Sequence, residues 1–299
     1  AEAECMRLVN ELSTAPPDVW VTYHNYYKAP DLIGPTVCEA LQIPYVQFES
    51  TRARKRLTGK WATFAAAAEA ASDAAQIVFY QTQQDAEALQ AYRTGTQRLI
   101  KIAPFLPFDQ LPQVANPAQN DDILTVAMMR AGDKMQSFAL LAEALAQLTA
   151  PKWRLCIVGD GPAREQVQAL TACFSTNVVF LGQLTRSELS QTYAKAGLFV
   201  WPGVNEAYGM VYLEAQAAGL PVVAQDRPGV RDVTYGGPHP DPTEGSLAVA
   251  QRIDALLKNP AQRQAEGTAA RTMVAANHLQ GHAKTKFRAA IRSLIGKQA

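Results

Sequence analysis

Short apolar runs alternate with helical stretches along almost the whole chain, and this order limits the fold more than any other feature. In the first third, apolar runs of strand length stand at residues 19–22, 45–48, 77–80 and 99–102. Helical patterns separate them at residues 31–41, 61–75 and 85–91, and the first residues of the chain also read as helix. Strands that are joined by helices run parallel, because the crossover returns the chain in the same direction. The alternation therefore predicts an α/β fold with helices on both faces of parallel sheets.

The alternation starts again after a polar, proline-containing stretch at residues 111–122, which is the predicted linker. Strands are expected at residues 123–128, 154–158, 178–180, 198–201 and 221–224, with helices at 137–148, 163–172, 186–194 and 210–218. Three more helices follow at residues 246–257, 260–277 and 284–295. We expect two Rossmann-like doubly wound domains that face a cleft, at residues 1–110 and 123–280, and a terminal helix at 281–299 that returns to the first domain. Ligands of such sheets bind beyond the carboxyl ends of the strands.

The composition is that of a globular protein without a bias toward nucleic acid. Of the 299 residues 48% are hydrophobic and 18% are charged, and the net charge is +1. The four cysteines follow no CxxC or metal-ligand spacing, so we expect reduced thiols. No apolar run approaches the roughly 20 residues of a membrane-spanning helix, and the first residues do not resemble a signal peptide. These features predict a cytoplasmic protein that does not bind nucleic acid.

The segment of residues 205–224 carries the most chemical information, and it reads as a loop, a helix and a strand. Gly209 allows a close backbone approach at the helix start, Gly219 suits a left-handed helix stop, and Pro221 prevents continuation. Glu206 precedes the helix and Glu214 lies inside it, so the two carboxylates reach different parts of one elongated ligand. Either glutamate alone would be ordinary on a solvated helix. Unpaired amides suit a diphosphate at this helix start, and they belong to Tyr208, Gly209, Met210 and Val211.

This segment resembles the donor motif of the family 4 retaining glycosyltransferases of the GT-B fold (glycosyl transferases group 1), in which seven residues separate two glutamates. Glu206 and Glu214 match these glutamates, and Gly209, Gly219 and Pro221 match their surroundings. The resemblance implies that Glu206 contacts hydroxyls of the transferred sugar and that Glu214 binds the nucleotide ribose. It also implies a nucleoside-diphosphate sugar as the donor substrate, with no further cofactor. No Asp-x-Asp motif of the kind that holds a metal in the other main class of these enzymes is present, so we expect no metal.

Other motifs of the family follow in the same order. Arg130 and Lys134 come after a predicted strand, and their counterparts hold the donor diphosphate from one loop, where cations stabilise a negatively charged leaving group. A solvated arginine and lysine in a loop would be the ordinary alternative. The chain departs from the family at Met129, where a glycine is usual, and the loop from Arg130 to Lys134 is slightly short. Further donor-side positions lie in two later turns, at Gly159, Gly182 and Gln183.

The first domain matches the family less closely, and its opening strand and glycine-rich loop have no counterpart, so we expect this domain to be incomplete. Glu49 follows the second strand where the family has a histidine, which argues against a His-assisted step there. A basic patch at residues 52–60 leads to Trp61 and suits either a solvated loop or contact with an anionic acceptor or membrane. The acceptor-side candidates are His24, Glu49, Arg54 and Arg56, although an exposed loop histidine is also ordinary.

The expected activity is transfer of a hexosyl group from a nucleoside-diphosphate sugar to a hydroxyl of a carbohydrate or lipid-linked acceptor, with retention of configuration. Attack on the face of the leaving phosphate, with that phosphate as base, would need positioning and electrostatics rather than a covalent nucleophile. Two other interpretations fit these residues: a nucleotide-sugar epimerase of GT-B architecture, and a catalytically silent nucleotide-sugar-binding module. If the basic patch binds anionic lipid, the protein is peripheral at the inner face of the membrane.

Overall fold

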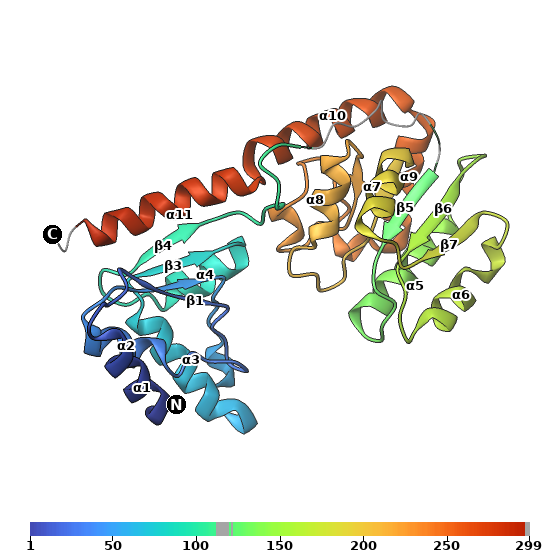
Figure 1. Ribbon diagram of the computed structural model, residues 1–299. Helices are drawn as coiled ribbons and strands as arrows, with labels where there is room; N and C mark the ends of the chain where they lie inside the picture. Colours follow the sequence, from blue (N-terminus) through green and yellow to red (C-terminus); the bar gives the residue numbers. More distant parts are fainter. Residues whose placement is uncertain (112–119, 121, 297–299) are drawn as a thin grey trace. The chain divides into compact units, whose positions relative to one another are not determined.

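The computed structural model describes residues 1–111, 120 and 122–296, and within them the chain forms two compact units (Figure 1). One unit consists of residues 1–103 with the C-terminal residues from 282 onward, and the other of residues 104–281. Most of the linker predicted at 111–122 falls outside the described residues. Each unit contains one sheet, and every strand pair within both sheets is parallel, as the alternation predicted.

The first unit has a four-stranded sheet with the strand order β1-β2-β3-β4. Its strands are β1 (Trp20–Tyr23), β2 (Tyr45–Phe48), β3 (Ile77–Tyr80) and β4 (Arg98–Lys101), and its helices are α1 (Glu2–Leu12), α2 (Gly34–Leu41), α3 (Ala62–Ala74), α4 (Gln83–Ala91) and most of α11 (Gln280–Ile295). The ring of Phe287 on α11 lies 6.2 Å from Phe48 and 5.0 Å from Phe79, centroid to centroid. Aromatic packing of this kind fixes the last helix against β2 and β3.

The second unit has a five-stranded sheet with the order β7-β6-β5-β8-β9. Its strands are β5 (Asp122–Val126), β6 (Arg154–Val158), β7 (Val178–Gly182), β8 (Leu198–Val200) and β9 (Val222–Val223). Its helices are α5 (Asp133–Leu145), α6 (Arg164–Thr171), α7 (Arg186–Lys195), α8 (Met210–Ala217), α9 (Gly245–Lys258) and α10 (Pro260–Asn277). The chain leaves β5 toward β6 and leaves β8 toward β9, so right-handed crossovers put α5 and α8 on opposite faces of the sheet. The two central strands, β5 and β8, therefore form a topological switch point.

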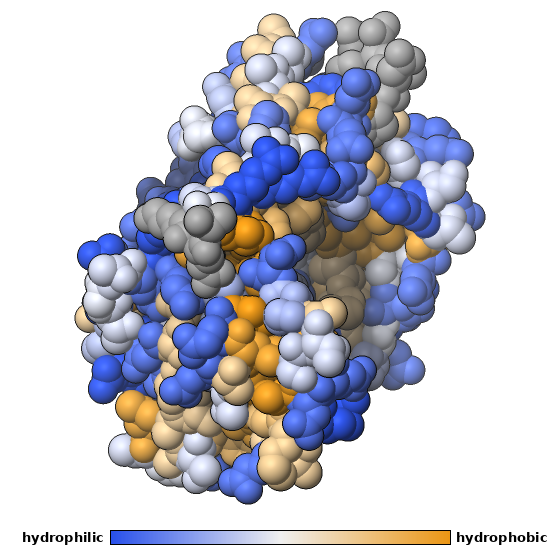
Figure 2. Space-filling view, turned by 60° about the vertical axis from the view of Figure 1, so that its left-hand side comes forward, coloured by the Kyte–Doolittle hydropathy of each residue, from blue (hydrophilic) through white to orange (hydrophobic). Residues whose placement is uncertain are grey.

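The core of the second unit is built from β-branched and aromatic side chains on the central strands. Phe199 and Trp201 are fully buried, and their rings pack edge to face against Tyr212 and Phe138 of the flanking helices. On the face drawn in Figure 2, apolar areas are broken up by hydrophilic side chains. No helix within the described residues is both long and apolar enough to span a bilayer.

Several helix boundaries differ from the prediction, and two of the differences concern helix starts. Helix α2 begins at Gly34 rather than at residue 31, because the Asp31 carboxylate accepts hydrogen bonds from the amides of Ile33 and Gly34. Helix α5 begins at Asp133 rather than at residue 137. Lys134 therefore stands in the first turn of a helix and not on the loop that was predicted to carry it together with Arg130.

Candidate functional site

The predicted donor residues gather at the carboxyl ends of β5 and β8, the two central strands of the second sheet. The chain runs from β5 through residues 127–132 into α5, and from β8 through residues 201–209 into α8. The crossovers leave these two strands in opposite directions, and ligands of doubly wound sheets bind beyond the strand ends at such a point. Arg130 and Lys134 follow β5, and Glu206 follows β8.

The loop after β8 is wrapped around the fully buried side chain of Tyr212. The hydroxyl of Tyr212 donates a hydrogen bond to the carbonyl of Trp201 at 3.0 Å. Gly203 and Gly209 both have positive φ angles, of 77° and 74°. A Cβ atom at Gly203 would lie 2.3 Å from the Tyr212 hydroxyl, and one at Gly209 would lie 2.7 Å from the Tyr212 ring. These two glycines are therefore required by close packing, and they fix the path of the backbone that carries Glu206.

The Glu206 carboxylate is held by two donors from different elements. Its Oε1 atom forms an ion pair with Nζ of Lys134 and accepts a hydrogen bond from Nε1 of Trp201 at 3.3 Å. The Lys134 ammonium also lies 5.3 Å from the centroid of the Trp201 ring. The side chains of Lys134 and Glu206 are only 16% and 15% exposed, so the pair is largely shielded from water. A cation in the first turn of a helix opposes the helix dipole, which indicates that Lys134 is placed there for its charge.

Arg130 is exposed, and no ion pair joins it to any residue in the described part of the chain. Its neighbour Met129 is fully buried, and the backbone of Met129 is bonded on both sides: its amide donates to the carbonyl of Asp160, and its carbonyl accepts from the amide of Ala163. The methionine that replaces the usual glycine is therefore a core side chain. The buried side chain and the two backbone hydrogen bonds of Met129 together hold the backbone in place directly before Arg130.

Gly159 supports the same loop by close packing. Its φ is 128°, and a Cβ atom there would lie 1.9 Å from the carbonyl oxygen of Ala127. Gly161 repeats the arrangement two residues later, with a Cβ position 2.2 Å from the carbonyl oxygen of Met129. The Gly-x-Gly turn thus lets two backbone segments touch, a role that the donor-binding prediction for Gly159 did not include.

Glu214 lies in α8, beside Tyr193 of α7. The Tyr193 hydroxyl donates a hydrogen bond to Oε2 of Glu214 at 3.0 Å. Burial raises the pKa of the Glu214 carboxyl, and the hydrogen bond from Tyr193 and the charge of Arg186 only partly offset this effect. A buried carboxyl group with a perturbed pKa is a candidate ligand-binding group. Tyr193 could not be predicted as a partner of Glu214, because it is distant in the chain and its neighbours show no motif.

The remaining donor-side positions lie at the end of β7 and at the start of α8. Gly182 ends β7 with a φ of 68°, and Gln183 follows it with an exposed side chain. Gly209 caps α8 without a side-chain hydrogen bond, and Met210 and Val211 open the helix, where amides have no intrahelical acceptor. Tyr208 is half-buried and packs against the core of the unit.

In the first unit, His24 and Glu49 follow β1 and β2, and both have positive φ angles, of 61° and 55°. The Nδ1 atom of His24 lies 4.0 Å from Oε1 of Glu49, and the hydroxyl of Tyr23 donates to Oε2 of Glu49 at 2.5 Å. This hydrogen bond raises the pKa of Tyr23 to about 12. Residues other than glycine seldom adopt such backbone angles, and they concentrate at functional sites.

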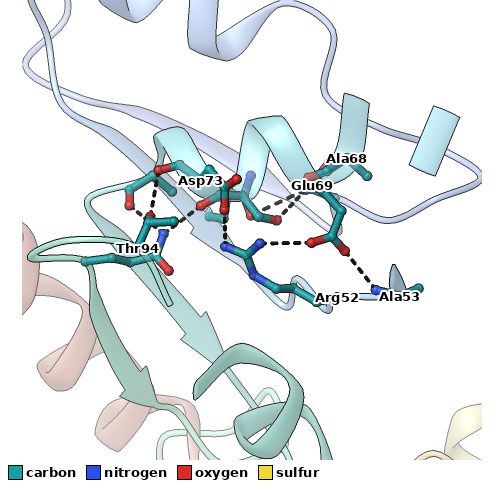
Figure 3. Close-up of polar contacts among 11 residues, drawn as sticks. Arg52, Ala53, Ala68, Glu69, Asp73 and Thr94 are labelled. Atoms are coloured by element: carbon teal, nitrogen blue, oxygen red, sulfur yellow. Dashed lines mark hydrogen bonds and ion pairs between the residues drawn. The ribbon is translucent and has the colours of Figure 1, made fainter. Parts of the chain in front are cut away.

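The basic patch differs from the prediction at Arg52, because this side chain is buried and paired rather than exposed. Its guanidinium donates to Oε2 of Glu69 at 2.9 Å and to Oδ1 of Asp73 at 2.6 Å, and Glu69 also accepts from the amide of Ala53 (Figure 3). Only 1% of the Arg52 side chain is exposed. Arg52 therefore anchors the loop to α3, and the exposed cations are those that come after it.

Three of these exposed cations, and the exposed Lys28 from an earlier loop, lie against aromatic rings. The guanidinium of Arg56 lies 5.1 Å from the Tyr27 ring, and that of Arg54 lies 4.6 Å from the Tyr92 ring. The ammonium groups of Lys28 and Lys60 lie 5.9 Å and 5.7 Å from the ring of Trp61. We call this set the cationic–aromatic surface. It consists of Tyr27, Lys28, Arg54, Arg56, Lys60, Trp61 and Tyr92.

Comparison with known proteins identifies the family. A profile of the glycosyl transferases group 1 family matches residues 110–273. The chain belongs to this family. It is 40% identical over 98 residues to the sulfoquinovosyl transferase SQD2 of Arabidopsis thaliana, an alignment that covers 33% of this chain and 18% of that protein. It is 34% identical over 152 residues to a GDP-mannose-dependent monoacylated alpha-(1-6)-phosphatidylinositol monomannoside mannosyltransferase of Corynebacterium glutamicum, over 46% of this chain and 38% of that protein.

Both alignments thus span less than half of the relatives' own lengths. Solved structures resemble the fold over nearly the whole chain. Sucrose-phosphate synthase from Thermosynechococcus elongatus superposes with a TM-score of 0.74 at 20% identity, over 98% of this chain and 78% of that one. Anabaena HepE, solved with UDP and glucose, gives a TM-score of 0.69 at 17% identity, over 96% and 79%. The predicted GT-B architecture with two parallel Rossmann-like sheets is confirmed.

Proposed function

We propose that this glycosyltransferase moves a hexosyl group from a nucleoside-diphosphate sugar to an acceptor hydroxyl and retains the anomeric configuration. The observation that carries the proposal is the Lys134–Glu206 pair at the switch point of the second sheet. It places a cation and a carboxylate side by side, beside the start of α8. A nucleoside-diphosphate sugar presents the complementary groups in the same order: an anionic diphosphate and a ring of hydroxyls.

The donor would lie along the strand ends of the second unit. In this arrangement Arg130, Lys134 and the amides at the start of α8 bind the diphosphate, since helix starts and cations both favour anions. Glu206 accepts hydrogen bonds from the sugar hydroxyls. Glu214 accepts hydrogen bonds from the ribose hydroxyls. These hydrogen bonds stabilise its carboxylate and so oppose the effect of burial on its pKa. The turn at Gly182 and Gln183 would face the nucleotide base.

The reaction would proceed on one face of the sugar. The bond between the anomeric carbon and the diphosphate oxygen breaks, the acceptor oxygen bonds to the same carbon, and the acceptor proton passes to the departing phosphate. Negative charge grows on the diphosphate as the bond breaks, and Arg130 and Lys134 stabilise it. No step needs a metal, and chelation by EDTA should leave turnover unchanged.

We propose the second unit as the donor domain and the first as the acceptor domain, with His24 and Glu49 at its strand ends. The acceptor would be a carbohydrate or a lipid-linked saccharide. The relative from Corynebacterium glutamicum is named for a phosphatidylinositol mannoside acceptor.

We further propose that the cationic–aromatic surface, which includes Arg54 and Arg56, makes peripheral contact with anionic membrane on the cytoplasmic side. Aromatic rings and cations together suit the boundary between headgroups and acyl chains. Sedimentation with vesicles of phosphatidylcholine alone, or with added phosphatidylglycerol, tests this contact. The double variant R54E/R56E should lose the binding to anionic vesicles, and binding that ignores both anionic lipid and salt would refute it.

The activity is tested by release of UDP or GDP during incubation of the protein with UDP-glucose or GDP-mannose and a panel of acceptors. The variant Glu206→Ala should lose turnover by at least about a hundredfold, the usual cost of removing a group that acts on the transition state. Unchanged turnover would refute the role of Glu206. Epimerised nucleotide sugar without any acceptor would identify an epimerase instead, and donor binding without turnover would identify a binding module.

A further inference from the structure

Trp201 is the buried residue that ties together the two charged groups of the donor site. It is the first residue after β8, and none of its surface is exposed. Its indole N–H donates to Oε1 of Glu206, and its ring lies 5.3 Å from the Lys134 ammonium. One side chain thus contacts both the carboxylate that we assign to the sugar and the cation that we assign to the diphosphate.

The position of the indole is fixed from two sides. Its ring packs edge to face against Phe138 of α5, with centroids 5.0 Å apart and planes at 73°. Its backbone carbonyl accepts the hydrogen bond from Tyr212 of α8. A tryptophan that is held by two helices cannot follow a ligand. The lysine on its four-carbon stem can, because its ammonium is a flexible point charge.

The contacts of Glu206 divide between its two oxygens. Oε1 accepts from both Lys134 and Trp201, whereas no residue in the described ranges donates to Oε2. A bound diphosphate would compete with Glu206 for the Lys134 ammonium, because it offers more negative charge. Once Lys134 turned to the diphosphate, the indole N–H would be the remaining donor on Oε1. That hydrogen bond would keep the carboxylate in place while Oε2 receives the sugar hydroxyls.

We propose that Trp201 is the positioning residue of the sugar subsite: its indole N–H holds Glu206 when the donor diphosphate draws Lys134 away. This inference rests on the proposed donor site. It predicts that Trp201 matters to the sugar half of the ligand and not to the nucleotide half. Without the indole N–H, the Glu206 carboxylate would be free to rotate and to follow the Lys134 ammonium. The sugar hydroxyls would then lose the carboxylate oxygen that accepts their hydrogen bonds.

The test compares the affinities of the protein for a nucleotide sugar and for the nucleotide alone, by calorimetry, with UDP-glucose against UDP and GDP-mannose against GDP. In Trp201→Phe, which keeps an aromatic ring but lacks the N–H, the ratio of the dissociation constants (nucleotide sugar over nucleotide) should rise about tenfold. This is the size expected for a hydrogen bond to a charged group. The affinity for the nucleotide alone should stay within about threefold of the wild-type value.

Phe138→Leu is the matched control, since it trims the ring that packs on Trp201 and leaves the indole N–H in place. Both variants remove buried aromatic surface and should lower the melting temperature, but only Trp201→Phe should change the ratio. An equal change in both variants, or none in either, would overturn the role of Trp201 while nucleotide-sugar binding by the wild type stood. If the wild type bound no nucleotide sugar, the donor site itself would be refuted. If it bound one without turnover, only transfer would be refuted, because the ratio does not depend on turnover.

Discussion

Replacing Glu206 by glutamine should tighten the binding of a bare nucleoside diphosphate, although the same change should abolish sugar transfer. In the donor-free protein the Lys134 ammonium is paired with the Glu206 carboxylate. If the diphosphate binds that ammonium, it must first displace the carboxylate. Glutamine keeps the size of the side chain and an oxygen that accepts from Trp201, but it has no charge. Lys134 is then available to the ligand from the start.

The size of the effect follows from how far the pair is buried. Exposed ion pairs contribute roughly 0–1 kcal/mol, whereas breaking a fully buried pair costs roughly 3–5 kcal/mol. The Lys134 and Glu206 side chains are 16% and 15% exposed, which places them between these limits. An energy of about 1.5 kcal/mol corresponds to an approximately tenfold gain in diphosphate affinity. The same loss should lower the melting temperature of the ligand-free protein by about 3–6 °C for a unit of this size.

Calorimetric titration with UDP and with GDP measures the affinity, and a thermal melt without ligand measures the stability. Lys134→Met supplies the control, because it should weaken diphosphate binding in the wild type and remove the gain in the Glu206→Gln background. The four proteins form a double-mutant cycle that isolates the pair. If Glu206→Gln bound both diphosphates no better than the wild type, the competition for Lys134 would be wrong.

Three further predictions concern stability. Burial raises the pKa of Glu214, so the native state loses stability as the pH rises above the ordinary pKa near 4.5. Glu214→Gln should therefore melt at a higher temperature than the wild type at pH 7 and at the same temperature at pH 4. A difference in melting temperature that does not change with pH would contradict this assignment. The carboxylate of the buried Asp254 accepts from the amides of Thr149 and Ala150, so Asp254→Ala should cost about 2–3 kcal/mol in urea unfolding, and a loss under about 0.5 kcal/mol would show that water replaces these bonds. Gly159→Ala should lower the free energy of unfolding by more than about 2 kcal/mol, because the new Cβ would clash with a carbonyl oxygen and because only glycine adopts this φ angle easily. Wild-type expression and an unchanged melting temperature would refute the packing role of Gly159.

The sequence was sufficient to predict the order of the elements and to single out the candidate donor residues. Strand and helix periods are local, so the parallel sheets could be predicted from runs of a few residues. The pair Glu206 and Glu214 could be found because it stands in one short segment whose glycines have fixed positions. Helix starts were less predictable: Lys134 was expected on a loop, but α5 begins one residue before it. A start that lacks a side-chain cap, as this one does, leaves little mark in the sequence.

Partners far apart in the chain could not be predicted. Lys134 and Glu206 are 72 positions apart, and no local sequence pattern predicts that they form an ion pair. The same holds for Tyr193, which bonds Glu214 from another helix, and for the burial of Arg52. Arg52 belongs to a run of cations that looks uniformly exposed in the sequence, yet its guanidinium is enclosed by two carboxylates of α3.

The class of fold and the candidate donor residues could be predicted from the amino-acid sequence alone, because both depend on the spacing of residues that lie close together in the chain. Which of those residues are in contact became clear only from the three-dimensional structure. In that structure Trp201 lies beside both Lys134 and Glu206, Arg130 is exposed, and Glu214 lies next to Tyr193. Ion pairing and the removal of side chains from water depend on neighbours in space. These neighbours exist only after distant strands have come together at one edge of a sheet.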